Sequence, residues 1–469
     1  MDTQAAEPGH GGEHEGSNGV GLGYCAAILV ACGVGAALPV PEGARGPVLA
    51  GIPFEFLLFG MTLLGVALFH RITLQVAVAG MLSIATFKVT FTTVIASDGM
   101  IEAFGLAHHM HHEWVVLANL LCLLLGFTLL SNHFEQSKIP ELLPKWLPNG
   151  WMGGFVLLVL VFFLSSFLDN IAAAMIGATI AKIVFKGRVH IGYLAGIVAA
   201  SNAGGSGSVV GDTTTTMMWI AGVSPVEVLH AYAAAFPALF ACGLIAAKQQ
   251  DAHQRIQADE TPDLRIDWGR VLIVAIVLIF AITVNVVVNL KYSEVSERFP
   301  FIGVAIALSI LVTAPIRKPS WSLLPSAFKG SCFLLSLVVC ASLMPVKELP
   351  VPSWKSAMGL GFLSAIFDNI PLTALAITQG GYDWGMLAYT VGFGGSMIWF
   401  GSSAGVAVSN TFPEAKSAVN WLRHGWHVTL AYVVGFAVLL GTVGWHPTAK
   451  RGDQAPPVAH GSELVVPGK

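Results

Sequence analysis

The sequence predicts an all-helical polytopic membrane protein, with about eleven transmembrane helices and two re-entrant hairpins in two inverted repeats. Three observations lead to this fold class: few charged residues, apolar runs near the length of a membrane span, and two motifs that each occur twice. Of the 469 residues, 55% are hydrophobic and 11% are charged, against about a quarter charged in soluble domains. Soluble enzymes, DNA-binding proteins and secreted disulfide scaffolds are therefore excluded. The formal net charge of -3 indicates no nucleic-acid partner.

Both ends of the chain are expected to be disordered tails. Residues 1–22 are rich in glycine and lack lysine and arginine, so they lack the basic start of a signal peptide. Residues 447–469 are polar and contain proline. Between the tails, the crossings are predicted at 23–40, 50–70, 72–97, 113–131, 190–223, 226–247, 270–290, 300–315, 329–345, 385–412 and 425–445.

The apolar segment 151–181 does not fit a single crossing. As one helix it would measure about 46 Å, longer than a hydrocarbon core of about 30 Å. The polar pair Asp169-Asn170 interrupts it, and basic residues such as Lys145 and Lys182 lie on both sides. Because basic residues favour the cytoplasm, we expect a re-entrant hairpin that turns at Asp169-Asn170 and opens to the cytoplasm. One long tilted helix with a polar kink is the alternative.

The same design recurs at 351–379, around Asp368-Asn369. The pattern Ser-x-x-x-Asp-Asn-Ile begins at Ser165 and again at Ser364, and Gly-Gly-Ser-x4-Gly begins at Gly204 and again at Gly394. Two matches in the same order indicate an internal repeat. An odd number of crossings in each copy inverts the second copy, so the second hairpin is expected to open outward. Inverted repeats with broken helices at the midplane are a plan of secondary transporters.

Hydroxyls, amides and glycines interrupt the predicted crossing 190–223, where residues 201–216 read SNAGGSGSVVGDTTTT. Glycine favours unwinding, and the freed carbonyls then need a cavity or an ion. Asn and Thr oxygens, carboxylates and carbonyls are hard ligands suited to Na+ or Li+. A carboxylate buried in a membrane, such as Asp169 or Asp212, can exchange a proton for a cation.

Packing is the alternative explanation for these residues, since glycine-rich stretches often form close helix contacts. The buried acids favour ion or proton handling, because carboxylates in a membrane are costly unless they have a function. The two copies are not equivalent, since Ser402 stands where the first copy has Asp212.

Two other features have open interpretations. Lys88 lies inside a crossing and either compensates a site carboxylate, reaches toward an interface or forms a structural pair. The histidines of 108–112 are interpreted as part of a solvated external loop, with metal capture or pH sensing as alternatives.

The motifs around the acids resemble those of NhaD-type sodium/proton antiporters, which belong to the ion transporter superfamily with arsenite permeases and divalent anion:sodium symporters. The resemblance rests on Asp169-Asn170, 202–205 with 211–215, 368–371 and 401–407. It implies cation or proton binding by Asp169, Asn170, Asn202, Asp212, Thr214, Thr215, Ser364, Asp368, Asn369, Ser402 and Ser403. It also implies a homodimer in which a transport domain slides, elevator-like, against a scaffold.

We therefore expect a secondary active transporter that exchanges Na+ or Li+ for H+. The alternative is a Na+- or H+-coupled transporter of an anion such as citrate, a dicarboxylate or arsenite. Helix N-termini at the hairpins favour an anion, whereas the lack of lysine and arginine at either hairpin tip disfavours one. A membrane scaffold or sensor would leave the buried acids without a role.

No nucleophile, metal or phosphate motif supports an enzyme, and no cofactor is expected beyond the transported ions. We expect scaffold helices at 23–135 and 270–345, halves of the transport domain at 136–247 and 346–446, and a cytoplasmic linker at 248–269. The expected location is the bacterial inner membrane, among lipids, with the N-terminus in the cytoplasm.

Overall fold

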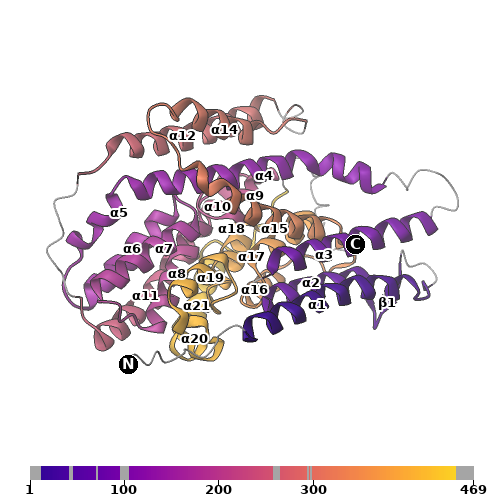
Figure 1. Cartoon of the computed structure of the whole chain (residues 1–469), viewed down its shortest axis with the longest axis horizontal. Helices are drawn as coiled ribbons and strands as arrows, with labels where there is room; N and C mark the ends of the chain where they lie inside the picture. Colours follow the sequence, from indigo (N-terminus) through magenta and orange to yellow (C-terminus); the bar gives the residue numbers. More distant parts are fainter. Residues whose placement is uncertain are drawn as a thin grey trace, which may run out of the picture.

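The computed structural model describes residues 12–41, 46–69, 72–95, 105–256, 265–292, 295 and 298–449. Nearly all the regular structure in these residues is helical (Figure 1). The exception is an antiparallel hairpin of β1 (Val48–Leu49) and β2 (Ile52–Pro53). Its turn residues Ala50 and Gly51 have φ of 52° and 80°, and positive φ at both positions is typical of a tight hairpin turn. The crossing predicted from residue 50 is therefore wrong at its start, because the helix begins only at Phe54, after this hairpin.

The first part of the chain forms long helices: α1 (Gly12–Ala36), α2 (Phe54–Leu68), α3 (Thr73–Ile95) and α4 (Gly105–Gln136). Because α1 begins at Gly12, the prediction of a disordered tail through residue 22 is wrong for 12–22. This stretch has no proline, and adding residues to an existing helix costs little free energy compared with starting a new one. The prediction of an external loop at 108–112 is also wrong, because these residues belong to α4.

The first interrupted segment is a helical hairpin. It consists of α6 (Trp151–Ser165) and α7 (Asn170–Val184). A Cβ atom on Gly177 of α7 would lie 2.4 Å from Cγ2 of Val161 of α6, whereas these positions would be about 24 Å apart along one straight helix. The segment therefore folds back on itself, and the single tilted helix is wrong.

The second interrupted segment also folds back. It consists of α16 (Trp354–Ser364) and α17 (Asn369–Gln379). The Nε2 of Gln379, at the end of α17, donates to the carbonyl of Pro350, just before α16, at 2.8 Å. The outer ends of this second hairpin therefore meet.

Two predicted crossings are each broken into two helices. The segment 190–223 consists of α8 (Ile191–Ser206) and α9 (Thr213–Ile220), and 385–412 consists of α18 (Trp384–Gly394) and α19 (Ser403–Thr411). Both breaks begin at or near the repeated Gly-Gly-Ser motif, as the sequence predicts.

The remaining helices complete the fold. They are α5 (Ile139–Leu142), α10 (Pro225–Leu229), α11 (Tyr232–His253), α12 (Trp268–Lys291), α14 (Phe301–Thr313), α15 (Leu324–Ser342), α20 (Ala418–His424) and α21 (Trp426–Thr442), with 3-10 turns at Leu143–Trp146, Trp321–Leu323, Val346–Glu348 and Pro413–Lys416. The predicted linker 248–269 is shorter than expected, because α11 continues to His253 and α12 begins at Trp268. Near the start of the expected C-terminal tail, Thr448 is held against α18, because the indole of Trp384 donates to its carbonyl at 2.8 Å. Residues 450–469 of the expected tail lie outside the described residues.

The broken helices pack together at the centre of the molecule. α8 packs on α6, α11 and α18, while α7 packs on α19 and α9 packs on α17. Around them, α4 packs on α12, α14 and α15, and α3 packs on α1, α2 and α15 (Figure 1). Each half of the chain thus contributes a hairpin and a broken helix to one central cluster.

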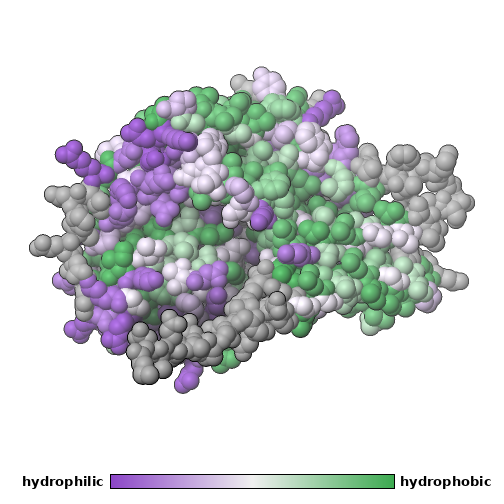
Figure 2. All heavy atoms as spheres, viewed as in Figure 1, coloured by the Kyte–Doolittle hydropathy of each residue, from purple (hydrophilic) through white to green (hydrophobic). Residues whose placement is uncertain are grey.

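The surface of the long helices is apolar. Figure 2 shows hydrophobic side chains over α12, α14 and the α1–α3 region, whereas hydrophilic side chains gather toward the end that carries α5. On the outer helices, Ile279 is 65% exposed and Val312 is 73% exposed. Such a surface is stable against lipid and costly against water.

Within the described residues, five helical stretches are long and apolar enough to cross a membrane, or six if the pair α20 and α21, bent by 61°, counts as one. They are Gly19–Ala36, Thr73–Thr90, Glu113–Gln136, Pro225–His253 and Trp321–Ser342. The protein is an integral membrane protein. Eleven crossings stays a prediction, because several predicted crossings are short or broken helices.

Candidate functional site

Four helices begin at the centre of the molecule, directly after the hairpin turns and the helix breaks. The N-cap residues of α7, α9, α17 and α19 are Asp169, Asp212, Asp368 and Ser402. Each side chain accepts a hydrogen bond from a backbone N–H of its helix, at distances between 2.9 and 3.2 Å. The start of a helix presents unpaired N–H groups and a partial positive charge. These caps therefore stabilise the helix starts and place one carboxylate at the start of each of α7, α9 and α17.

Asp212 is the most completely surrounded of these acids and is only 2% exposed. Its Oδ1 accepts hydrogen bonds from the backbone nitrogen and the hydroxyl of Thr214, both at 2.9 Å. Its Oδ2 accepts from Nδ2 of Asn170, on the first hairpin, at 2.9 Å. Asp212 therefore joins the tip of the hairpin to the start of α9.

Asn202 connects the two halves of the chain. Its Oδ1 accepts from Nδ2 of Asn170 at 3.1 Å, and its Nδ2 donates to the hydroxyls of Ser396 at 2.9 Å and Ser402 at 3.1 Å. Ser396 was not among the predicted site residues. Its position in the second Gly-Gly-Ser motif was the signal that could have found it.

The second copy holds a smaller polar cluster. The Oδ2 of Asp368 accepts from the hydroxyl of Ser403 at 3.3 Å, and Asn369 is buried beside it. Two predicted residues instead bind backbone carbonyls: Ser364 donates to Val391 at 2.7 Å, and Thr215 donates to Ser208 at 2.6 Å. The structure thus gathers the predicted site residues, but these last two hydroxyls hold the backbone around the breaks.

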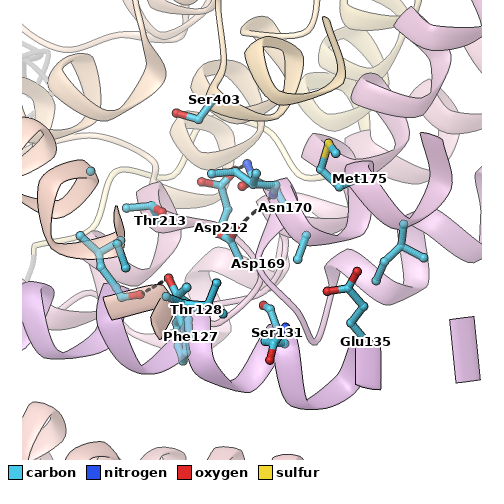
Figure 3. A pocket seen from close by; sticks show the side chains of 18 of the residues that line it. Phe127, Thr128, Ser131, Glu135, Asp169, Asn170, Met175, Asp212, Thr213 and Ser403 are labelled. Atoms are coloured by element: carbon cyan, nitrogen blue, oxygen red, sulfur yellow. Dashed lines mark hydrogen bonds between the residues drawn. The ribbon is translucent and has the colours of Figure 1, made fainter. Parts of the chain in front are cut away.

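A cavity of about 570 Å³ opens onto the acids of the first copy. Figure 3 shows Asp169, Asn170 and Asp212 on one side of it and α4 on the other. The α4 side carries the polar residues Thr128, Ser131, Asn132 and Glu135. Sequence reasoning missed this polar face, although its spacing of three and four residues matches one side of a helix.

The charged side chains among the described residues that line this cavity are Glu135, Glu141, Asp169 and Asp212, all acids. A cleft lined by one sign of charge raises the local concentration of the opposite ion. A second cavity, of about 240 Å³, reaches Asp368 and Ser403. Both copies of the acidic motif are therefore in contact with a cavity.

Two features with open interpretations lie away from the acids. The Nζ of Lys88 pairs with Oε1 of Glu55 at 3.0 Å, between α3 and α2, so the structure favours the structural pair over compensation of a site carboxylate. Nε2 of His109 lies 3.1 Å from the hydroxyl of Ser342, which links α4 to α15. Among the side chains that the structure describes, no group of three or more His, Cys, Asp and Glu is arranged to hold a metal ion.

Fold and site together define a mostly helical membrane protein in which α7, α9 and α17 each begin at a carboxylate near the centre of the molecule. No family model matches the chain. The chain is similar to sodium/proton antiporter 1 of Arabidopsis thaliana, with 26% identity over 325 residues, which cover 60% of this chain and 52% of that protein.

Bacterial proteins are similar over more of their length. The Na+/H+ antiporter NhaD of Vibrio parahaemolyticus is 25% identical over 379 residues, 64% of this chain and 84% of that protein. The NhaD of Alkalimonas amylolytica is 23% identical over 392 residues, 70% of this chain and 78% of that protein. The resemblance to NhaD-type antiporters that the motifs indicate is thus confirmed. The match spans about half of the first relative's length.

Proposed function

We propose that the protein is a secondary active transporter that exchanges Na+ or Li+ for H+. The observation that carries this proposal is the buried carboxylate of Asp212, which the Asn170 amide and the Thr214 hydroxyl hold beside an acidic cavity. A carboxylate, hydroxyl and amide oxygens offer hard ligands to an alkali cation. The same carboxylate binds a proton when the cation is absent, so the two ions compete for one site.

Transport of an anion is the less favoured candidate. An anion would be attracted to the positive starts of the helices, but the starts of α7, α9 and α17 are already capped by Asp169, Asp212 and Asp368. The acidic lining of the larger cavity also repels an anion. The names of the relatives, which are sodium/proton antiporters, agree with cation exchange.

We assign the direct ion contacts to Asp169, Asn170, Asn202, Asp212, Thr214, Asp368, Asn369, Ser402 and Ser403. Thr215 and Ser364 contribute by holding the broken backbone. In this proposal the hairpins and broken helices form a mobile transport domain, α3, α4 and α15 belong to a scaffold, and two copies assemble as a dimer. The two halves act as inverted repeats, with motion of one domain against the other providing alternating access.

Exchange is tested with the full chain in proteoliposomes, by following internal pH after an inward Na+ gradient is imposed. Asp169→Asn and Asp212→Asn are each expected to abolish Na+-driven proton release while the protein remains monodisperse. Glu414→Gln, an exposed acid in a 3-10 turn, is the matched control and should exchange normally. Exchange retained by either aspartate variant would remove that carboxylate from the mechanism.

The proposed orientation, with a cytoplasmic N-terminus in the bacterial inner membrane, has a separate test. Single cysteines at the exposed positions Lys145 and Lys186 flank the first hairpin, and cysteines at Val351 and Gln379 flank the second. The first pair should react with an impermeant thiol reagent only from the cytoplasmic side, and the second pair only from outside. Labelling of one pair from opposite sides would contradict the re-entrant arrangement.

A further inference from the structure

The two copies of the broken helix differ in side-chain size at two matched positions. Asn202 stands two residues before Gly204, and the matching position before Gly394 is Gly392. Asp212 directly follows Gly211, and the matching residue in the second copy is Ser402. The first copy thus carries the larger residue at both positions.

The larger side chains of the first copy lie against the smaller residues of the second. Nδ2 of Asn202 donates to the hydroxyl of Ser402 at 3.1 Å. A Cβ atom on Gly392 would lie 3.7 Å from Oδ2 of Asp212, 3.9 Å from the carbonyl oxygen of Asn202 and 3.5 Å from Cβ of Ser206. The position beside the Asp212 carboxylate therefore has room for about one methyl group, which would touch two oxygen atoms at van der Waals distance.

Gly392 differs from other glycines around the breaks, because a methyl group fits there. At Gly204 and Gly211 a Cβ would lie 2.0 and 2.1 Å from backbone oxygens, and at Gly394 it would lie 2.2 Å from one. Backbone packing therefore requires glycine at those three positions. It does not require glycine at Gly392, where the contacts of an added methyl are ordinary van der Waals distances.

We propose that Gly392 is a specificity-determining residue, which leaves the room beside Oδ2 of Asp212 that the transported Na+ occupies. This inference rests on the proposed cation exchange at Asp212. A proton bound to the carboxylate needs no such room, whereas a cation needs space for its own radius. Because Li+ is smaller than Na+, a methyl group at this position is expected to hinder Na+ more than Li+.

The test compares wild-type protein, Gly392→Ala and a matched control, Gly154→Ala, in proteoliposomes. Gly154 lies on α6, where an added Cβ would meet Tyr193 at 3.5 Å and Ala247 at 3.6 Å, so it tolerates a methyl group equally well but away from the acids. The apparent KM for Na+ and for Li+ and the pH profile with saturating Li+ are measured for each.

Gly392→Ala is expected to raise the KM for Na+ on the order of tenfold and the KM for Li+ less, with the pH profile unchanged and the control unchanged. A KM for Na+ within about twofold of wild type, or an equal rise for both cations, would overturn the proposal. Failure of Gly392→Ala to give monodisperse protein would also overturn it, because the methyl group would then not fit. If wild-type protein exchanges neither cation, the proposed function itself is wrong, and the two failures are thus distinguishable.

Discussion

The hydrogen bonds from Asn202 to Ser396 and Ser402, which join the two halves of the chain, predict that Asn202→Ala lowers the stability of the protein. Asn202 is fully buried and takes part in three hydrogen bonds, with Asn170, Ser396 and Ser402. A typical intramolecular hydrogen bond contributes about 1 kcal/mol net to folding. Asn202→Ala is therefore expected to lower the free energy of unfolding by about 3 kcal/mol. Asn420→Ala, on the exposed surface of α20, is the control and should change it by less than about 0.5 kcal/mol.

The assay is unfolding in mixed micelles with a denaturing detergent, followed by tryptophan fluorescence. It is run without Na+ or Li+, because a bound cation would stabilise the folded state and hide part of the effect. A double-mutant cycle with Ser402→Ala should show a coupling of about 1 kcal/mol. A loss no larger than that of the Asn420 control would refute the conclusion that these bonds hold the two halves together.

Two further predictions concern ion pairs outside the proposed site. Lys88→Met removes the partner of the buried Glu55 carboxylate, so it should lower the free energy of unfolding by about 3 kcal/mol. The KM for Na+ should not change, and a raised KM would instead indicate that Lys88 takes part in transport. The Arg317 guanidinium, which donates to Asp267 at 2.9 Å, lowers the pKa of that half-buried carboxyl. Its stabilising effect is therefore present above the unfolded-state pKa and lost as pH falls through the folded-state pKa. Asp267→Asn should lower thermal stability at pH 7 and have no effect at strongly acidic pH, and an equal effect at both would contradict this.

The hairpins and the broken helices could be predicted from the sequence, because polar pairs and glycines interrupt otherwise apolar segments. Asp169-Asn170 marks the start of α7, and Gly205 lies next to the end of α8. Such interruptions act within one or two turns of the chain, so local sequence is enough to find them.

Contacts between distant segments could not be predicted in this way. Asn202 and Ser402 lie 200 positions apart in the sequence, and their contact depends on how the two copies pack. The partner of Lys88 and the face of α4 that lines the cavity depend on tertiary packing too. A tight turn at Ala50-Gly51 was missed for a different reason, since it lacks the Asn-Gly or Asp-Gly pair typical of such turns.

The central claim, that one carboxylate site alternately holds a cation or a proton, is tested most directly by Na+ binding to the purified protein at several pH values. Titrations are performed with and without citrate. If the two ions compete, the apparent Kd for Na+ should rise by about tenfold for each pH unit below the pKa of the site, and citrate should not change it. A Na+ affinity that is independent of pH but strengthened by citrate would contradict the account and favour an anion symporter.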